Sequence, residues 1–187
     1  MPTNVLAVGL FAVTGAFRLM GLWLLKLKPF QVAEKTQIDR AFATAIGAIG
    51  AYAAVAGFSL LGAEPLRAPY NEFFGLIHVY YGMVLLVGTI SLWNEWDLRP
   101  ASYLAFLGGI INLIYVYMNE TLIRNSSYPL IFGPAALVGL TAPLATHLKS
   151  VWVSRMVGIL CLILAGAALY IGANAIVGHV ARGLKPA

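Results

Sequence analysis

Six apolar segments follow one another along this chain, and each is long enough to cross a lipid bilayer. They cover approximately residues 4–25, 41–62, 72–93, 100–118, 128–147 and 156–178. An α-helix rises about 1.5 Å per residue, so about 20 residues span the hydrocarbon layer. Backbone polar groups find no partners in lipid, and segments of this length must therefore be helical. The sequence predicts an all-α polytopic membrane protein, a six-transmembrane-helix bundle that forms a single transmembrane domain over 1–187.

The composition agrees with this fold and excludes several functions. The chain is 60% hydrophobic and 10% charged, and its mean hydropathy is +0.84. Its formal net charge of +5 comes from loop and terminal residues, apart from Arg18, which indicates contact with lipid headgroups and not with nucleic acid. The sequence contains no P-loop, dinucleotide-binding or zinc-protease motif, and no span contains paired carboxylates. We therefore expect neither an enzyme nor a cofactor.

The distribution of Lys and Arg predicts how the bundle is oriented. With an even number of spans, both termini lie on the same side of the membrane. The loops on the other side carry more basic residues, seven against four. The seven are Lys26, Lys28, Lys35, Arg40, Arg99, Lys149 and Arg155, and the four are Arg67, Arg124, Arg182 and Lys185. Basic loops stay in the cytoplasm, so the sequence predicts a cell-membrane protein with both termini outside.

The fourth segment carries small and polar residues on one helical face, because they recur at spacings of four and three. The face consists of Ala101, Ala105, Gly108, Asn112, Tyr115 and Asn119. Asn112 lies near the middle of the span, where an unpartnered amide costs several kcal/mol. This face must therefore meet protein or water. We take Gly108, Asn112, Tyr115 and Asn119 as candidate pore or solute-binding residues, with His78 of the third segment at the outer mouth.

Other polar residues fall near the outer ends of three predicted helices. We expect them to form an outer vestibule, consisting of Asn71, Glu72, Glu120 and Asn174. Scattered interfacial groups and hydrogen bonds between helices are an alternative explanation. A metal or haem site is a third, with His78 and His179 as ligands together with Glu72 or Glu120.

Arg18 is the most expensive residue to place in a membrane. It lies about seven residues from the inner end of the first segment, where a charged side chain costs up to about 3 kcal/mol. Side chains lean toward the N-terminus of a helix, so extension toward the inner headgroups is unfavourable. We expect a buried charge, held by Glu95, Asp97, backbone carbonyls or water. A role in lining the pore remains an alternative.

Part of the chain, about 73–115, resembles the urea/amide channel family (AmiS/UreI). The matching motifs are Phe73-Phe74-Gly75, the D-x-R-P sequence formed by Asp97, Arg99 and Pro100, then Ser102-Tyr103 and Ile111-Asn112. The resemblance implies a homo-oligomeric channel for small uncharged solutes such as urea or amides. The run 156–160 lacks the glutamate that this family carries in its last helix. The chain also resembles an uncharacterised prokaryotic integral-membrane family, from which no function carries over.

The function that we expect is a membrane channel or transporter for a small uncharged, urea- or amide-like solute. Amide and phenol groups can replace the hydration of such a solute without adding net charge. The partners would then be membrane lipid, the small neutral solute and other copies of the chain. Two alternatives remain open: a non-catalytic integral-membrane subunit of a larger complex, and a haem- or metal-binding membrane protein.

Overall fold

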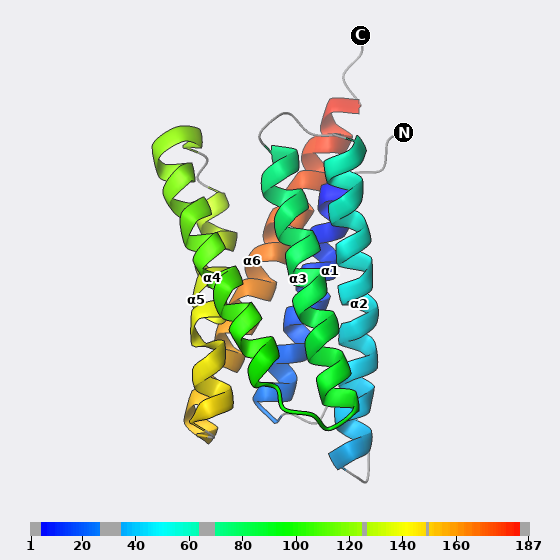
Figure 1. Ribbon diagram of the computed structural model, residues 1–187. Coiled ribbons are helices and arrows are strands. Elements are labelled where there is room, and N and C mark those ends of the chain that lie inside the picture. The colour runs from blue at the N-terminus through cyan, green and yellow to red at the C-terminus, as the bar shows by residue number, and fades with distance from the viewer. Residues whose placement is uncertain (1–4, 27–34, 64–69, 125–126, 149, 184–187) are drawn as a thin grey trace.

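The computed structural model is an all-α bundle of six long helices (Figure 1), as the six apolar segments predict. It describes residues 5–26, 35–63, 70–124, 127–148 and 150–183. The helices are α1 (Val5–Leu24), α2 (Lys35–Ala63), α3 (Tyr70–Trp93), α4 (Arg99–Met118), α5 (Tyr128–His147) and α6 (Val151–Gly183), with a π-helical turn, η1 (Asn119–Ile123), after α4. All six are long and apolar enough to cross a membrane. The protein is therefore a multi-pass membrane protein whose helices contact lipid.

Two helices extend well past their predicted apolar segments. α2 begins at Lys35 instead of near 41, and α6 covers Val151–Gly183 instead of 156–178. The extensions contain charged residues such as Asp39, Arg40 and Arg155. Charge marks where the hydrocarbon layer ends, but the backbone hydrogen bonds of a helix continue into the headgroup region. Hydropathy therefore locates the span and not the end of the helix.

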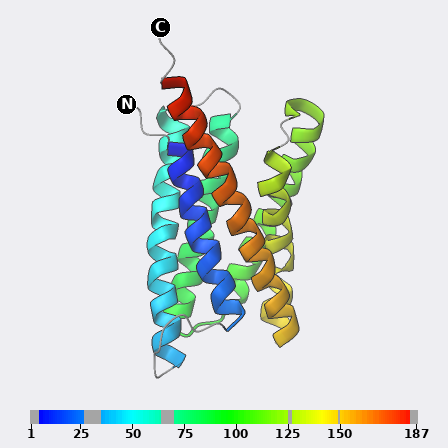
Figure 2. The ribbon, with the colours of Figure 1, turned by 180° about the vertical axis from the view of Figure 1, so that it is seen from behind.

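Successive helices run in opposite directions, so α1 begins and α6 ends at the same end of the bundle (Figure 1). We call this the terminal end, and we call the end that carries residues 94–98 the opposite end. Packing is most extensive in three pairs, α2 with α3, α1 with α6, and α4 with α5. The α4–α5 hairpin stands beside the other four helices, and α6 crosses from α1 toward α5 (Figure 2).

Glycines bring the paired helices into close contact. A Cβ on Gly57 of α2 would lie 2.6 Å from the backbone nitrogen of Val79 in α3. A Cβ on Gly139 of α5 would lie 2.5 Å from the carbonyl oxygen of Ala105 in α4. Lipid supplies little hydrophobic drive for helices to associate, so close packing of backbones stabilises each pair.

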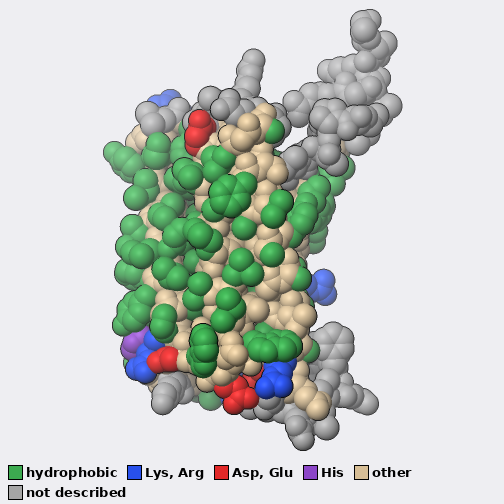
Figure 3. All heavy atoms as spheres, turned by 45° about the vertical axis from the view of Figure 1, so that its right-hand side comes forward, with side chains coloured by type: hydrophobic (Ala, Val, Ile, Leu, Met, Phe, Trp, Pro, Cys, Tyr) green, Lys and Arg blue, Asp and Glu red, His purple; other side chains and the backbone are tan. Residues whose placement is uncertain are grey.

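Apolar side chains cover the outside of the bundle. On the face in Figure 3 they occupy most of the middle, and the charged side chains lie mainly near the two ends. Exposed residues such as Phe58, Leu107 and Tyr170 belong to this surface. A soluble protein does not expose so large an apolar area, whereas lipid requires it.

Candidate functional site

A buried hydrogen bond joins α4 to α3 near the centre of the bundle. The side-chain nitrogen of Asn112, Nδ2, donates to the hydroxyl oxygen of Tyr81 at 2.5 Å. The same nitrogen donates to the carbonyl oxygen of Gly108 at 2.6 Å. A carbonyl oxygen only accepts, so this contact fixes which side of the amide carries the nitrogen. Asn112 is fully buried, and its predicted position inside the bundle is confirmed.

Most of the predicted face of α4 points inward. Gly108, Asn112 and Asn119 are buried and Tyr115 is half-buried, whereas Leu113 and its exposed neighbours face outward. The spacing of four and three therefore identified the inner face correctly. The structure brings Asn112 and Gly108 together, and it places Tyr115 and Asn119 closer to the terminal end.

Aromatic rings fill the space between α3 and the α4–α5 hairpin near the terminal end. We call them the aromatic cluster, which consists of Tyr70, Phe73, Phe74, Tyr115, Tyr128 and Phe132. The ring centroids of Phe73 and Tyr115 lie 4.8 Å apart, and those of Tyr115 and Phe132 lie 5.4 Å apart, with the rings edge to face. Tyr115 therefore packs within this cluster.

His78 is buried, and its ring packs against Gly9 of α1. Its Nδ1 lies 2.6 Å from the carbonyl oxygen of Phe74, which can only accept, so Nδ1 carries the proton. The other ring nitrogen, Nε2, has no hydrogen-bond partner within the described part of the chain. A Cβ on Gly9 would lie 2.7 Å from Nε2, so glycine leaves the room that the ring needs.

The residues of the predicted vestibule do not share one environment. Asn71 is buried, and Glu72, Glu120 and Asn174 are exposed. Within the ranges that the structure describes, no hydrogen bond or ion pair joins these three exposed side chains. The side chain of His179 lies outside the described residues. Among those described, no group of three His, Cys, Asp or Glu side chains could hold a metal ion.

A cavity of about 160 Å³ occupies the half of the bundle that faces the opposite end. It reaches from Tyr81 to Leu24, Leu92 and Thr146 in the last turns of α1, α3 and α5. All six helices contribute to its wall. The lining includes Trp23, Tyr81, Gly88, Thr89, Ser102 and Thr146. The described lining contains no Asp, Glu, Lys, Arg or His, and none of the predicted pore residues contributes to it.

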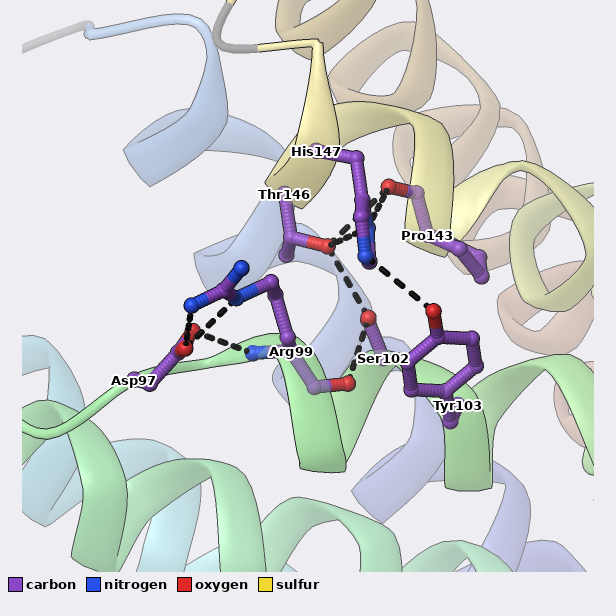
Figure 4. Close-up of polar contacts among 7 residues, drawn as sticks. All are labelled: Asp97, Arg99, Ser102, Tyr103, Pro143, Thr146 and His147. Atoms are coloured by element: carbon purple, nitrogen blue, oxygen red, sulfur yellow. Dashed lines mark hydrogen bonds and ion pairs between the residues drawn. The ribbon is translucent and has the colours of Figure 1, made fainter.

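Three polar side chains of this cavity are satisfied by neighbours. The hydroxyl of Ser102 donates to the carbonyl oxygen of Arg99 at 2.7 Å, and it lies 2.9 Å from the hydroxyl of Thr146 (Figure 4). The hydroxyl of Thr146 also donates to the carbonyl oxygen of Pro143 at 3.0 Å. The indole nitrogen of Trp23 donates to the carboxylate of Asp39 at 2.8 Å.

Two other hydroxyls of the cavity have hydrogen-bonding capacity to spare. The hydroxyl of Thr89 is buried and has no partner among the described residues. The hydroxyl oxygen of Tyr81 accepts from Asn112, and within the described ranges its own proton has no acceptor. The carbonyl oxygen of the Asn112 side chain is also buried without a described partner. Buried polar groups are usually paired, so the unsatisfied capacity of Tyr81 and Asn112, which contact each other, marks the middle of the bundle as a candidate site.

The D-x-R-P motif has a structural explanation at the start of α4. The carboxylate of Asp97 accepts from the backbone nitrogen of Arg99 at 2.9 Å and forms an ion pair with its guanidinium (Figure 4). Pro100 occupies the first turn, where a missing N–H costs nothing. Hydrogen bonds from Arg99 hold the pKa of Asp97 below its ordinary value. These contacts begin the helix at the edge of the cavity.

Arg18 is not buried, contrary to the expectation from its cost in lipid. Its side chain is exposed on the face of α1 that also exposes Val8 and Phe11. Within the described part of the chain it forms no ion pair, because Asp97 pairs with Arg99 and Glu95 is exposed. Successive side chains of an α-helix are rotated by about 100° about its axis, so Arg18 lies outside the buried row that contains Phe17.

Sequence reasoning missed the cavity itself. Gly88, Thr89, Ser102 and Thr146 lie on α3, α4 and α5, and the sequence shows only that they are small. A void depends on how far the backbones stand apart, and no single helix carries that information. The only available signal was the presence of small residues in α3, α4 and α5 near the opposite end of the bundle.

Comparison with known proteins identifies the family but no activity. No curated protein and no solved structure matches the chain significantly. The family that matches is described as a protein of unknown function, and the match covers residues 1–182. The urea/amide channel family, which the motifs in residues 73–115 suggested, does not match the chain. The chain therefore belongs to the family of proteins of unknown function DUF981.

Proposed function

We propose that this protein is a channel or transporter, and not an enzyme. It binds a small uncharged solute in the cavity between its six helices and passes the solute across the membrane. The cavity carries the proposal, because six helices of one chain surround it and its described lining has no acidic, basic or histidine side chain. Ion pathways usually have charged rings or rows of carbonyl oxygens. A cavity without them favours a neutral solute.

The route from the cavity to the terminal end runs along the inner face of α4. A solute would pass Tyr81 and Asn112, then the aromatic cluster that contains Tyr115, and then the buried Asn119. Close packing closes this half of the bundle. Each aromatic pair contributes about 0.5–1.5 kcal/mol beyond its buried area. Passage therefore requires the α4–α5 hairpin to move away from α3.

The proposed route lies within a single copy of the chain, because all six of its helices contribute to the wall of the cavity. A homo-oligomer, which the resemblance to urea/amide channels implies, would give each copy its own route. The proposal therefore does not depend on oligomeric state, and it can be tested in liposomes that contain only the purified protein.

The test is stopped-flow light scattering of proteoliposomes with urea, acetamide and glycerol, beside sodium chloride. We expect faster entry of at least one neutral solute than in protein-free vesicles, and no increase for the salt. Gly88→Leu should abolish this flux, because a Cβ at Gly88 would meet only Ala101 and a larger side chain would fill the cavity. Gly166→Leu is the matched control, because nothing lies within 4 Å of a Cβ there.

Wild-type vesicles that pass none of these solutes faster than protein-free vesicles would contradict the proposal. The alternative of a non-catalytic subunit would then gain support if the protein is purified from native membranes together with a partner. Equal flux in Gly88→Leu and wild type would remove the cavity from the route.

A further inference from the structure

We infer that the ligand of the cavity is a small neutral amphipathic molecule, with a hydrocarbon body and a single hydrogen-bonding group such as an amide or a hydroxyl. This inference rests on the proposed function and specifies the chemical class of the solute. Its basis is the wall of the cavity, which is predominantly apolar, together with the hydroxyl of Tyr81 in that wall, whose proton has no acceptor among the described residues.

The size of the cavity limits the ligand. Its volume is about 160 Å³. An engineered apolar cavity of about 150 Å³ in another protein stays dry and binds benzene. The comparison indicates a ligand with about six to eight non-hydrogen atoms. Urea is smaller than this and would leave much of the apolar wall without contacts.

The polar groups of the cavity limit the ligand further. Ser102, Thr146 and Trp23 already bond to protein groups, as described above. The spare capacity is the proton of the Tyr81 hydroxyl, which has no acceptor among the described residues. It can satisfy one carbonyl, amide or hydroxyl group of a ligand. The unpaired hydroxyl of Thr89 lies beside Gly47 of α2, about 12 Å farther along α3, and takes no part in this contact. Urea offers four N–H donors and a carbonyl, and most of them would lie unpaired against hydrocarbon, which is costly.

A series of straight-chain primary amides tests this class, from acetamide to octanamide, with urea beside it. Binding to the purified protein in nanodiscs is measured by calorimetry and by the fluorescence of Trp23, which lines the cavity, in a variant whose other three tryptophans are phenylalanine. Burial of one methylene contributes about 0.8 kcal/mol, or about fourfold in affinity. We expect this gain per carbon up to about eight non-hydrogen atoms, followed by a loss when the cavity is full.

Two variants separate binding in the cavity from partition into lipid. Gly88→Leu should abolish saturable binding, and Gly88→Ala should move the optimum to a shorter amide, because its added methyl occupies part of the cavity. Gly166→Leu should bind like wild type. Melting temperatures check that each variant is folded. We expect all three to fold, because leucine and alanine favour a helix more than glycine does.

Each outcome bears on a different statement. Affinity that rises without limit, equally in Gly88→Leu and wild type, would be partition into lipid and would overturn the inference. Urea or acetamide binding as tightly as pentanamide would overturn the class while the proposed function survives. Saturable binding of the predicted amides without flux of any neutral solute would overturn the proposed function and leave the ligand class standing.

Discussion

The amide nitrogen of Asn112 lies 2.5 Å from the hydroxyl oxygen of Tyr81, and this contact connects α4 to α3 where the cavity ends toward the terminal end. It therefore serves two purposes. As a hydrogen bond between helices it stabilises the contact of the α4–α5 hairpin with the other four helices. As the boundary between the cavity and the aromatic cluster, it also lies on the proposed route of the solute.

A double-mutant cycle measures the first of these purposes. Tyr81→Phe and Asn112→Ala each remove one partner, and the double variant removes both. Hydrogen bonds between membrane helices contribute about 0.6 kcal/mol on average and at most about 1.7 kcal/mol. We expect a coupling energy in this range from reversible unfolding in micelles. A coupling energy near zero would mean that this hydrogen bond does not stabilise the bundle.

Asn112→Leu tests the second purpose. Leucine removes the amide and adds bulk beside Gly108, so it should abolish flux in liposomes while the protein stays folded. Tyr81→Phe is the comparison, because it keeps the ring and leaves the bond from Asn112 to the Gly108 carbonyl. Normal flux in a stable Asn112→Leu protein would remove this face of α4 from the route.

Glycine packing between α4 and α5 gives a prediction about stability. A Cβ on Gly139 would lie 2.5 Å from the carbonyl oxygen of Ala105 and 2.7 Å from the Cα of Gly109. Gly139→Ala should therefore separate the two helices and cost about 1–3 kcal/mol. Gly166→Ala on α6 meets nothing within 4 Å and should leave the melting temperature equal or slightly higher. Equal effects of the two substitutions would contradict the close contact.

The sequence was sufficient for the fold because the bilayer restricts it so strongly. Apolar length identified all six spans, and the spacing of polar residues identified the inner face of α4 from Gly108 to Asn119. The helix ends were predicted less well. Asp39 and Arg155 lie inside helices that continue beyond the hydrocarbon layer, where hydropathy carries no signal.

The site was predicted less completely, because a helical face shows which residues point inward and not what they meet there. Tyr115 meets aromatic rings, His78 meets Gly9, and Asn112 meets Tyr81. Those partners come from other helices and depend on how the backbones cross. The cavity depends on the same distances and therefore could not be found from any single segment.

Arg18 gives a prediction that reverses the expectation from sequence. It is exposed on α1 and has no ion-pair partner in the described ranges, so Arg18→Leu removes a charge from an apolar surface. We expect a higher unfolding free energy in a bilayer, by at most about 3 kcal/mol. Arg155→Leu is the control, because its guanidinium lies over the ring of Trp152 near the start of α6. If Arg18→Leu instead lowers the unfolding free energy more than Arg155→Leu does, another copy of the chain or a lipid phosphate holds this arginine.

Asp97 gives a prediction about pH. Hydrogen bonds from Arg99 lower its pKa in the folded protein, so the carboxylate stabilises the fold above its ordinary pKa of 3.8. This stabilisation is lost as the pH falls through the lowered value. Asp97→Asn should lower the melting temperature slightly at neutral pH, and the difference from wild type should vanish in acid and shrink in salt. Glu120→Gln is the control, because that exposed carboxylate has no partner among the described residues.

Topology is the last prediction. More basic residues lie in the loops at the opposite end than at the terminal end, so the opposite end should face the cytoplasm. Asn94 and Thr121 are exposed residues near the opposite end and the terminal end, respectively. In a Cys161→Ala background, an impermeant thiol reagent applied to intact cells should label Thr121→Cys and not Asn94→Cys. Permeabilised cells should label both and so show that each thiol is accessible. Labelling of Asn94→Cys alone in intact cells would invert the orientation, and the cavity would then open toward the outside.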